Sequence, residues 1–364
     1  MNIARLSTSL LRQCRYFMLD IKQNRACASL FQKKSDMKSF SILAKTALLL
    51  LLVATVGCHK DNDGLPSDLS KFYRMKSFEV GVIPEQRTVQ VLFQVTDYEG
   101  KGVSSLKAEN FTVTENDGKI DSEADLRVGI SSIPFELKTV LLLDITRSVE
   151  GFVPQIKTAA RSLVESKLPE QQIAIYTFDS ETHAVQPFTK SKAELLAAID
   201  AIPETNLVNS TNLYGAVIEV AGLWEDNYTI DGIVDGSMVI FTDGRHNASQ
   251  SITLAQAKSA LGTRRAYVAA LSSPDLDEAS LKSLANSTDR YFKAEDSAGL
   301  EKMFTDIQAE IQSLSNSIYF LYYQSPISDP TPYLNELVID IKDNVNNGKD
   351  SQILELFNSE GFGN

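Results

Sequence analysis

The chain has 364 residues, of which 43% are hydrophobic and 23% are charged. This ordinary globular composition provides mass for two domains and excludes a collagen-like, low-complexity or wholly disordered protein. Residues 1–57 hold nine Lys and Arg against two Asp and Glu, so the rest carries 26 basic and 45 acidic residues, a net charge of −19. We therefore expect no nucleic-acid partner, because phosphate binding needs a basic surface. An acidic body is compatible with cation binding.

The N-terminal region has the pattern of a targeting segment. Residues 47–56 form an apolar run that follows Lys38 and Lys45 and ends at Gly57 and Cys58. The run is too short to cross a bilayer, which needs about 20 residues. Its length is that of a signal-peptide core.

Residues Thr55-Val56-Gly57-Cys58 resemble the lipobox of a bacterial lipoprotein signal, in which Leu is more usual at the position of Thr55. The resemblance implies that Cys58 receives the lipid, palmitate included, and becomes the mature N-terminus. Residues 1–36 fit no secretory pattern, so we expect translation to start at Met37 and residues 1–57 to be the leader. The competing interpretation is an uncleaved helix with a buried cysteine.

A charged segment follows the lipobox. The sequence His59-Lys60-Asp61-Asn62-Asp63 resembles the surface-export signal of Bacteroidetes lipoproteins, and a charged linker is the competing interpretation. We expect residues 58–72 to be a lipidated tether that holds the protein in the bacterial cell envelope. The expected location is the outer membrane, with display at the cell surface as the further expectation. The mature chain keeps a single cysteine and forms no internal disulfide.

Two β-rich stretches flank the centre of the chain. In residues 73–136, apolar and polar residues alternate over 89–95, and a second strand pattern covers 111–115. In residues 316–364, strand patterns recur at 318–323, 337–341 and 353–357. Together the two stretches reach the roughly 100 residues of an immunoglobulin-like sandwich. We predict one β-sandwich that an inserted domain interrupts, and two separate β units are the alternative.

Residues 137–315 show a different pattern. Val140 to Leu143 is a continuous apolar run, as in a strand buried on both faces of a parallel sheet. Further strands are expected at 173–178, 238–241 and 266–271, with helices at 156–164, 193–199, 213–224, 253–261, 277–285 and 297–314. Alternating strands and helices predict an α/β fold, a doubly wound and mostly parallel sheet with helices on both faces.

Polar residues follow two of these strands and open one helix. They are Asp144, Thr146 and Ser148 after the first strand, Thr211 before a helix, and Asp243 after the strand at 238–241. Because the carboxyl ends of parallel strands meet at one edge of the sheet, we expect these side chains to converge. Their hard oxygens select Mg²⁺, Mn²⁺ or Ca²⁺ over Zn²⁺ or Cu²⁺. Two carboxylates leave a divalent ion under-neutralised, so we expect a partner's Asp or Glu to complete the site.

This arrangement resembles the von Willebrand factor type A domain over residues 137–315. Asp144, Thr146 and Ser148 fall on the family's DxSxS motif, Thr211 on its loop threonine and Asp243 on its TDG aspartate. The resemblance implies a metal-ion-dependent adhesion site with direct bonds from the three hydroxyls and contacts through water from the two aspartates. Thr146 replaces the family's first serine, and its methyl group stiffens the side chain. The competing interpretation is a degenerate site whose polar loops only cap turns and helices.

Two further features lie beside these motifs. Arg147 and His246 are candidate contacts to a bound partner, and exposed surface residues are the competing interpretation for both. The stretch from Asp97 to Gly118 resembles the segment that precedes this domain in bacterial von Willebrand-type proteins.

The leading hypothesis is a lipid-anchored envelope protein that binds a protein partner through a divalent ion, with no small-molecule substrate and no catalytic residues. An Asp after an apolar strand also begins haloacid-dehalogenase-type phosphatases, but their general acid would stand at Thr146. Three scattered histidines do not make a zinc site. The alternative is a metal-independent scaffold subunit of an envelope complex. A metal-dependent phosphoesterase is a third hypothesis, for which no general base is evident.

Overall fold

A computed structural model of the chain describes residues 68–120, 125–130, 133–205, 207–248, 251–274, 276–329 and 333–363. The leader, the lipobox and Cys58 lie outside these residues, so the lipid anchor stays a prediction. Within the described ranges, none of the helices is both long and apolar enough to span a membrane.

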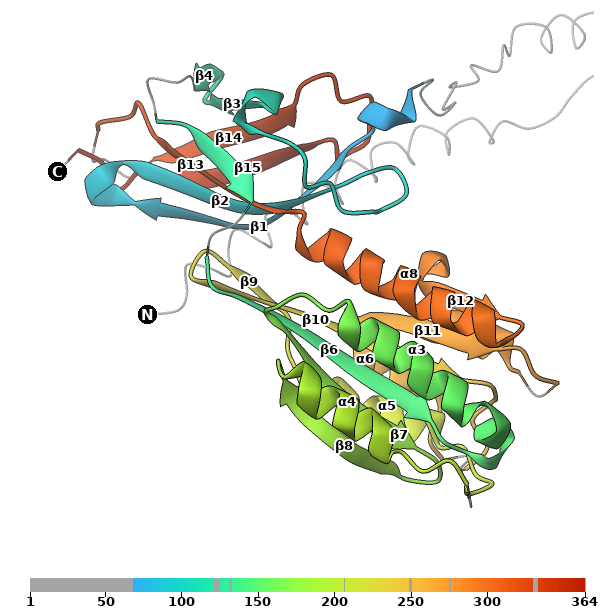
Figure 1. Ribbon diagram of the computed structural model, residues 1–364. Helices are drawn as coiled ribbons and strands as arrows, with labels where there is room; N and C mark the ends of the chain where they lie inside the picture. The colour runs from blue at the N-terminus through green and yellow to red at the C-terminus, as the bar shows by residue number, and fades with distance from the viewer. Residues whose placement is uncertain are drawn as a thin grey trace, which may run out of the picture. The chain divides into compact units, whose positions relative to one another are not determined.

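A seven-stranded sheet forms the centre of the α/β region (Figure 1). Its order is β12-β11-β10-β6-β7-β8, with β9 paired to β10. Only β8 and β9 run antiparallel to their neighbours, which confirms the predicted mostly parallel sheet. The strands are β6 (Phe135–Asp144), β7 (Gln171–Phe178), β8 (Thr182–Thr189), β9 (Asn227–Thr229), β10 (Gly232–Thr242), β11 (Arg265–Leu271) and β12 (Tyr291–Ala294).

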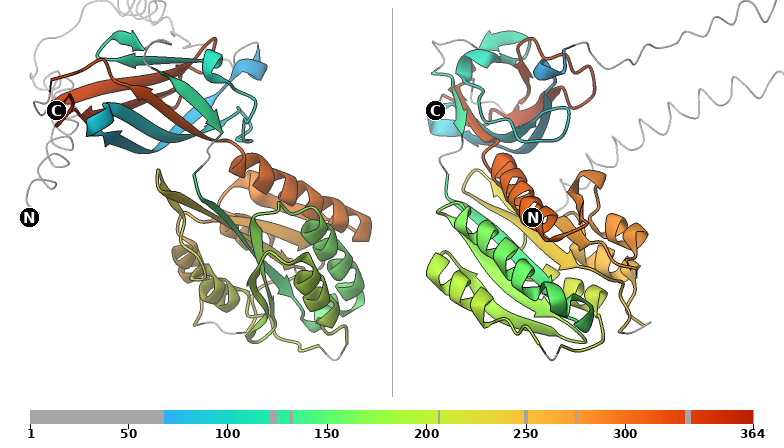
Figure 2. Two further views of the ribbon diagram at one scale, coloured as in Figure 1. Left: turned by 60° about the vertical axis from the view of Figure 1, so that its left-hand side comes forward. Right: turned by 45° about the vertical axis from the view of Figure 1, so that its right-hand side comes forward.

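Helices cover both faces of this sheet, as Figures 1 and 2 show. One buried cluster joins α3, α4 and α8 to side chains such as Leu141 and Val239, and another joins α5, α6 and α7 to Val140 and Ile240. Successive residues of β6 and β10 thus face opposite cores, which explains their unbroken apolar runs. The helices are α3 (Val153–Glu165), α4 (Lys192–Ala201), α5 (Leu213–Ala221), α6 (Leu254–Leu261), α7 (Glu278–Leu284) and α8 (Ser297–Ser315). Helix α5 ends three residues before the predicted end at 224.

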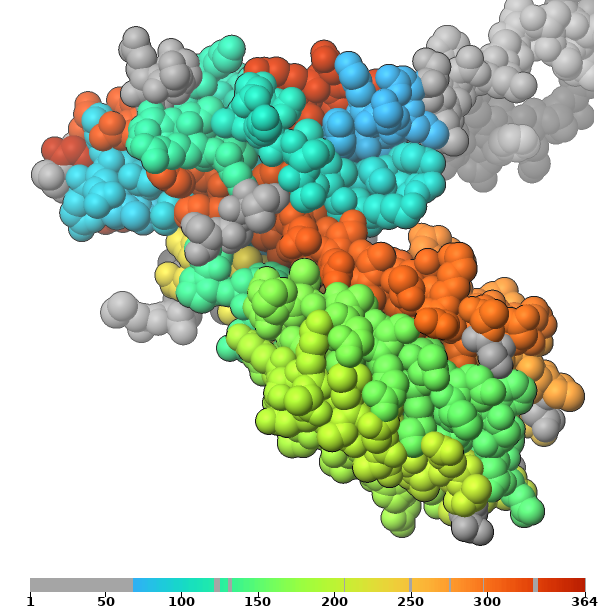
Figure 3. Space-filling view, in the orientation of Figure 1, coloured from blue at the N-terminus to red at the C-terminus, as the bar shows by residue number. Residues whose placement is uncertain are grey.

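Strands from before and after the α/β region share two antiparallel sheets. One has the order β1-β2-β13-β5 and the other β15-β14-β3-β4. Leu321 pairs with Val91, and Ile339 pairs with Val113, so both sheets combine the two stretches. Figure 3 shows the early (blue to cyan) and late (red) segments packed side by side. The strands are β1 (Arg74–Ile83), β2 (Thr88–Thr96), β3 (Phe111–Glu115), β4 (Gly118–Ile120), β5 (Arg127–Ile130), β13 (Ile318–Gln324), β14 (Leu334–Ile341) and β15 (Gln352–Asn358).

A common core lies between these two antiparallel sheets. Phe93, Phe111 and Tyr319 form a buried aromatic cluster with ring centroids 5.6–5.7 Å apart. The two stretches therefore bury one joint core, while the immunoglobulin-like topology stays a prediction.

Short 3₁₀ helices interrupt the loops of the chain at Leu69–Lys71, Pro84–Gln86, Ala108–Asn110, Arg147–Phe152 and Thr288–Arg290.

The amino-terminal end of the parallel strands contacts the antiparallel sheets. The rings of Phe78 in β1 and Tyr228 in β9 stack with centroids 4.2 Å apart. Next to them, the Ile230 amide donates to Glu79 Oε2 at 2.6 Å. Leu92, Ile233 and Ile318 close a small apolar cluster between the two regions. These contacts occupy one end of the sheet, and the carboxyl ends of β6 and β10 lie at the other.

Candidate metal centre

Two adjacent strands and two loops bring the predicted ligands together. Asp144 is the last residue of β6, and Asp243 directly follows β10. The two strands pair in parallel with Leu143 opposite Phe241, so both aspartates leave the sheet at the same edge. Thr211 precedes the Asn212 N-cap of α5, and its loop reaches the same edge through the bond from the Asn247 amide to its carbonyl, at 2.9 Å.

The side-chain oxygens form two hydrogen-bonded pairs, and the hydroxyl oxygens of the two pairs lie 3.1 Å apart. Asp144 Oδ1 accepts from the Thr146 amide at 3.0 Å and from Thr146 Oγ1 at 2.6 Å, while Asp144 Oδ2 accepts from Thr242 Oγ1 at 2.7 Å. Thr146 Oγ1 lies 3.1 Å from Ser148 Oγ. Ser148 Oγ in turn donates to Asp243 Oδ1 at 2.8 Å. Each of four of the five predicted ligands therefore contacts at least one other directly.

The spacing of these oxygens fits a small hard cation. Neighbouring ligands of an octahedral Mg²⁺ with bonds of 2.0–2.1 Å are separated by about 2.9 Å. The Thr146–Ser148 and Ser148–Asp243 oxygen pairs, at 3.1 and 2.8 Å, bracket that value. Thr211 lines the same cleft as Ser148 and Asp243. The predicted ligands offer hydroxyl and carboxylate oxygens and no thiol or imidazole. This donor set favours Mg²⁺, Mn²⁺ or Ca²⁺.

Burial disfavours the charged form of the carboxylates at this edge of the sheet. Asp144 is fully buried and Asp243 is 4% exposed. Burial raises the pKa of Asp144 to about 6, the bonds from Thr146 and Thr242 oppose that rise, and the charge of Asp243 adds to it. A cation between the two carboxylates would favour their charged forms. Among the described residues, no group of three or more His, Cys, Asp and Glu side chains is placed to hold a metal, so this centre depends on hydroxyls.

A cleft of about 360 Å³ opens beside these ligands. Sequence reasoning missed most of its walls, and it also missed Thr242, which bonds Asp144. The lining residues are Ser148, Phe152, Asn209, Thr211, Asp243, Gly244, Arg245, Asn247, Leu271, Ser272, Ser273 and Pro274. The cleft therefore offers the ligand oxygens to a bound molecule.

Comparison with known families agrees with this geometry. Residues 139–306 match the von Willebrand factor type A domain. This part of the chain is a von Willebrand factor type A domain. Domains of this family commonly bind a divalent metal at a metal-ion-dependent adhesion site, and they typically mediate protein–protein interactions.

Solved structures with similar folds come from several organisms, while no curated protein matches the chain. Proximal thread matrix protein 1 from the mussel byssus is 16% identical over 50% of this chain and 48% of that chain, with a TM-score of 0.41. This chain therefore spans about half the length of the mussel protein. A von Willebrand factor type A protein from Catenulispora acidiphila is 12% identical over 81% of this chain and 74% of that chain, with a TM-score of 0.45. The von Willebrand factor domain of the type V pili tip protein Mfa5 from Porphyromonas gingivalis is 15% identical over 50% of this chain and 96% of that chain, with a TM-score of 0.38.

The two predicted partner contacts of the von Willebrand factor type A domain have different surroundings. The Arg147 side chain is exposed, and its amide donates to the Val208 carbonyl at 2.9 Å. The His246 ring is half-buried and stacks on Tyr214 with centroids 4.4 Å apart. Arg245, rather than Arg147 or His246, is among the described residues that line the cleft.

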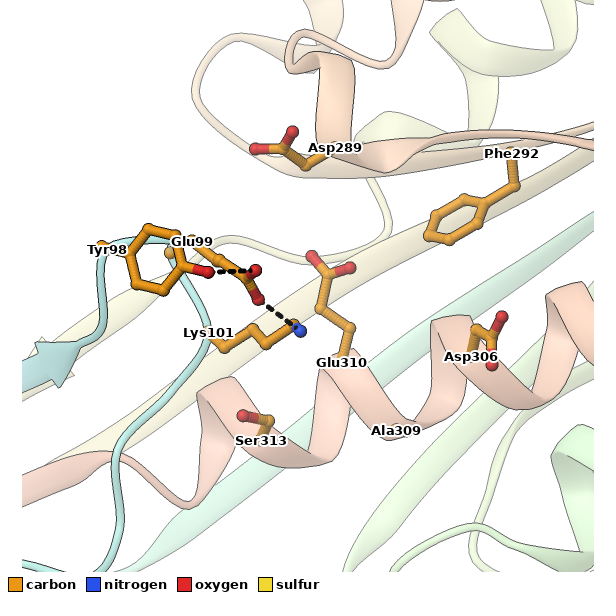
Figure 4. Close-up of a pocket in the computed structure, with 10 residues that line it drawn as sticks. Tyr98, Glu99, Lys101, Asp289, Phe292, Asp306, Ala309, Glu310 and Ser313 are labelled. Carbon is orange, nitrogen blue, oxygen red and sulfur yellow. Dashed lines mark hydrogen bonds and ion pairs between the residues drawn. The ribbon is translucent and has the colours of Figure 1, made fainter. Parts of the chain in front are cut away.

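A larger cavity of about 800 Å³ lies away from the metal centre, between the 98–101 loop and α8 (Figure 4). Its carboxylates already have basic or hydroxyl neighbours within the chain. Glu99 accepts from Tyr98 at 2.7 Å and pairs with Lys101 at 2.6 Å. Asp306 pairs with Lys302, and Glu310 lies 3.9 Å from Arg290. We assign no function to this cavity.

Proposed function

We propose that the chain binds a protein partner through a divalent ion held by its von Willebrand factor type A domain. The proposal depends above all on the row of closely spaced oxygens that joins Asp144, Thr146, Ser148 and Asp243. Ser148 and Asp243 line a cleft that Thr211 also lines. Mg²⁺ is the expected ion, with Mn²⁺ and Ca²⁺ as the alternatives.

The hydroxyl and carboxylate residues would have different roles in binding the ion. The hydroxyls of Thr146, Ser148 and Thr211 would bind it directly, and the two aspartates would orient the hydroxyls and balance the charge. Asp144 is suited to the orienting role because both of its oxygens already accept bonds from hydroxyl groups. The bound ion supplies a Lewis-acidic position that still seeks an anion. An Asp or Glu side chain of the partner completes the coordination.

Titration of Mg²⁺ and Mn²⁺ into the chain from His59 onward, followed by calorimetry, tests the metal centre. We expect one saturable site in the wild type and none in Asp243→Ala. Asp231→Ala is the matched control, because Asp231 is exposed and precedes the opposite end of β10. Unchanged binding in Asp243→Ala would show that the assignment is wrong. Partner capture from envelope extracts that persists in EDTA would favour the metal-independent scaffold instead.

We also propose that a lipid on Cys58 anchors the protein in the outer membrane, with the domain displayed at the cell surface. This proposal rests on the lipobox and the charged segment after it. Metabolic labelling with palmitate should mark the wild type and leave Cys58→Ser unlabelled. Protease added to intact cells should digest the domain if it faces outward. Equal labelling of both forms would exclude this anchor.

A further inference from the structure

The cleft beside the ion ligands has both apolar and polar lining residues. Phe152, Leu271 and Pro274 are apolar, and of these Phe152 is 38% exposed and Leu271 is 2% exposed. Arg245 and Asn247 are polar and lie on the loop that follows Asp243. Within the described lining, Arg245 is the one basic side chain. A second negatively charged group on a bound molecule would therefore pair with Arg245.

Backbone bonds hold the loop that carries Arg245 next to the ligands. The Gly244 amide donates to Thr242 Oγ1 at 3.2 Å. Asn247 bonds Thr211 in both directions: the Asn247 amide donates to the Thr211 carbonyl at 2.9 Å, and the Thr211 amide donates to Asn247 Oδ1 at 2.7 Å. Arg245 lies between these two tethers. Its backbone is therefore fixed against the metal centre, while its exposed side chain is available to a ligand.

We infer that Arg245 selects partners that present two carboxylates, one for the ion and one for its guanidinium. This inference rests on the proposed metal-dependent function and adds the class of partner. A guanidinium binds a carboxylate through two parallel hydrogen bonds, which a neutral amide cannot reproduce. The chain after residue 57 has a net charge of −19, so an exposed arginine beside the ion is a local exception to the acidic surface. An acidic segment needs such a local positive site to approach this protein.

The size of the cleft agrees with a peptide segment as the ligand. Its volume of about 360 Å³ is close to the lower end of ligand pockets, roughly 300–1,000 Å³. That space admits neighbouring side chains of a short segment. The ligand class that we infer from the ion ligands and Arg245 is a protein segment with two acidic side chains close together.

A series of small carboxylates tests the inference without knowledge of the partner. The Mg²⁺-loaded chain is titrated by NMR with malonate, succinate, glutarate and adipate, and with the monoamide of each acid. We expect one chain length to bind about tenfold more tightly than its monoamide, because only the second carboxylate can pair with the guanidinium. Arg245→Gln should reduce this preference to less than about twofold and leave the monoamide affinity unchanged.

Charge-matched variants make the assignment specific. Arg161→Gln, in α3, removes a half-buried arginine of the same domain that pairs with Asp200, and should keep the full preference. Equal affinity of the wild type for the diacids and their monoamides would overturn the inference. Loss of the preference in Arg147→Gln but not in Arg245→Gln would also overturn it, since the second carboxylate would then bind elsewhere.

Mg²⁺ affinity in the absence of any carboxylate separates the two proposals. Arg245→Gln should bind Mg²⁺ as tightly as the wild type or about twofold more tightly, because a nearby positive charge is removed. If the wild type binds no Mg²⁺, the proposed metal centre fails. If Mg²⁺ binds normally but the diacid preference is absent, only the role of Arg245 fails.

Discussion

Two buried aspartates lie at opposite ends of the same parallel sheet. Asp235, near the start of β10, forms an ion pair with Arg265 of β11 and accepts a bond from the Tyr228 hydroxyl. Ser315, at the end of α8, donates to its other oxygen at 3.1 Å. In the part of the chain that the structure describes, Asp144 is bonded by hydroxyl and amide groups, and no ion pair reaches it.

The comparison distinguishes a structural carboxylate from one that is suited to an external cation. Burial opposes the charge on Arg265, but Asp235 beside it holds the pKa of the guanidinium above its usual value. Burial raises the pKa of Asp144 to about 6, because the protein supplies hydroxyl bonds in place of a positive charge. One end of the sheet thus contains its own counter-ion, whereas at the other end no ion pair within the described residues neutralises Asp144.

The largest expected effect comes from the amino-terminal end. Asp235→Asn leaves the Arg265 charge buried and unpaired, so we expect a loss of about 3–5 kcal/mol in the free energy of unfolding. Asp144→Asn removes a costly buried charge and should change that free energy by no more than about 1 kcal/mol in the metal-free protein. Urea unfolding in EDTA measures both. Similar losses in the two variants would contradict the comparison.

Metal binding should show the opposite ranking. Asp144→Asn should weaken Mg²⁺ binding about 10- to 100-fold, because residues that orient ligands commonly have effects of this size. Asp235→Asn, measured well below its unfolding midpoint, should keep the wild-type affinity. Calorimetry or competition with a fluorescent chelator provides the measurement. A strong loss of Mg²⁺ affinity in Asp235→Asn would mean that the two ends of the sheet are coupled.

The pH dependence sharpens the same contrast. The pKa of Asp144 is about 6 in the folded chain and about 3.8 in the unfolded one, so its protonated form stabilises the metal-free fold below about pH 4. This contribution is lost as the pH rises through 6. Mg²⁺ requires the charged carboxylate, so its affinity should fall about tenfold from pH 7 to pH 5. Titrations at both pH values test this, and in Asp144→Asn the dependence should largely vanish.

The fold was predictable where burial imposes a pattern on the sequence. The apolar run from Val140 to Leu143 identified β6, and the 3.6-residue period identified α3. Strand β8 was missed because it is an edge strand with no buried residue among those described, and so has no alternating pattern. Strand β1 was missed because most of its residues are half-buried and a bulge between Ser77 and Glu79 breaks the alternation.

The candidate site was predictable where its residues end a strand or begin a helix. Asp144 and Asp243 stand directly after apolar runs, which marked both as residues at the carboxyl edge of the sheet. The bond from Thr242 to Asp144 depends on the pairing of β6 with β10, a contact across 98 positions that no local pattern encodes. The place of Arg245 in the cleft likewise depends on tethers to the distant Thr211 loop.

The smallest expected effect tests the departure of this chain from its family. Thr146 Oγ1 donates to Asp144 and lies 3.1 Å from Ser148 Oγ, and its methyl group restricts rotation about χ1. Thr146→Ser keeps the hydroxyl and should change Mg²⁺ affinity by less than about threefold, since only rotamer freedom differs. Thr146→Val keeps the shape but removes the oxygen, so it should weaken binding at least tenfold and leave Asp144 Oδ1 with one donor fewer. If Thr146→Ser and Thr146→Val bind Mg²⁺ equally well, the hydroxyl is not a ligand, and the contrast between the two ends of the sheet would depend on the aspartates alone.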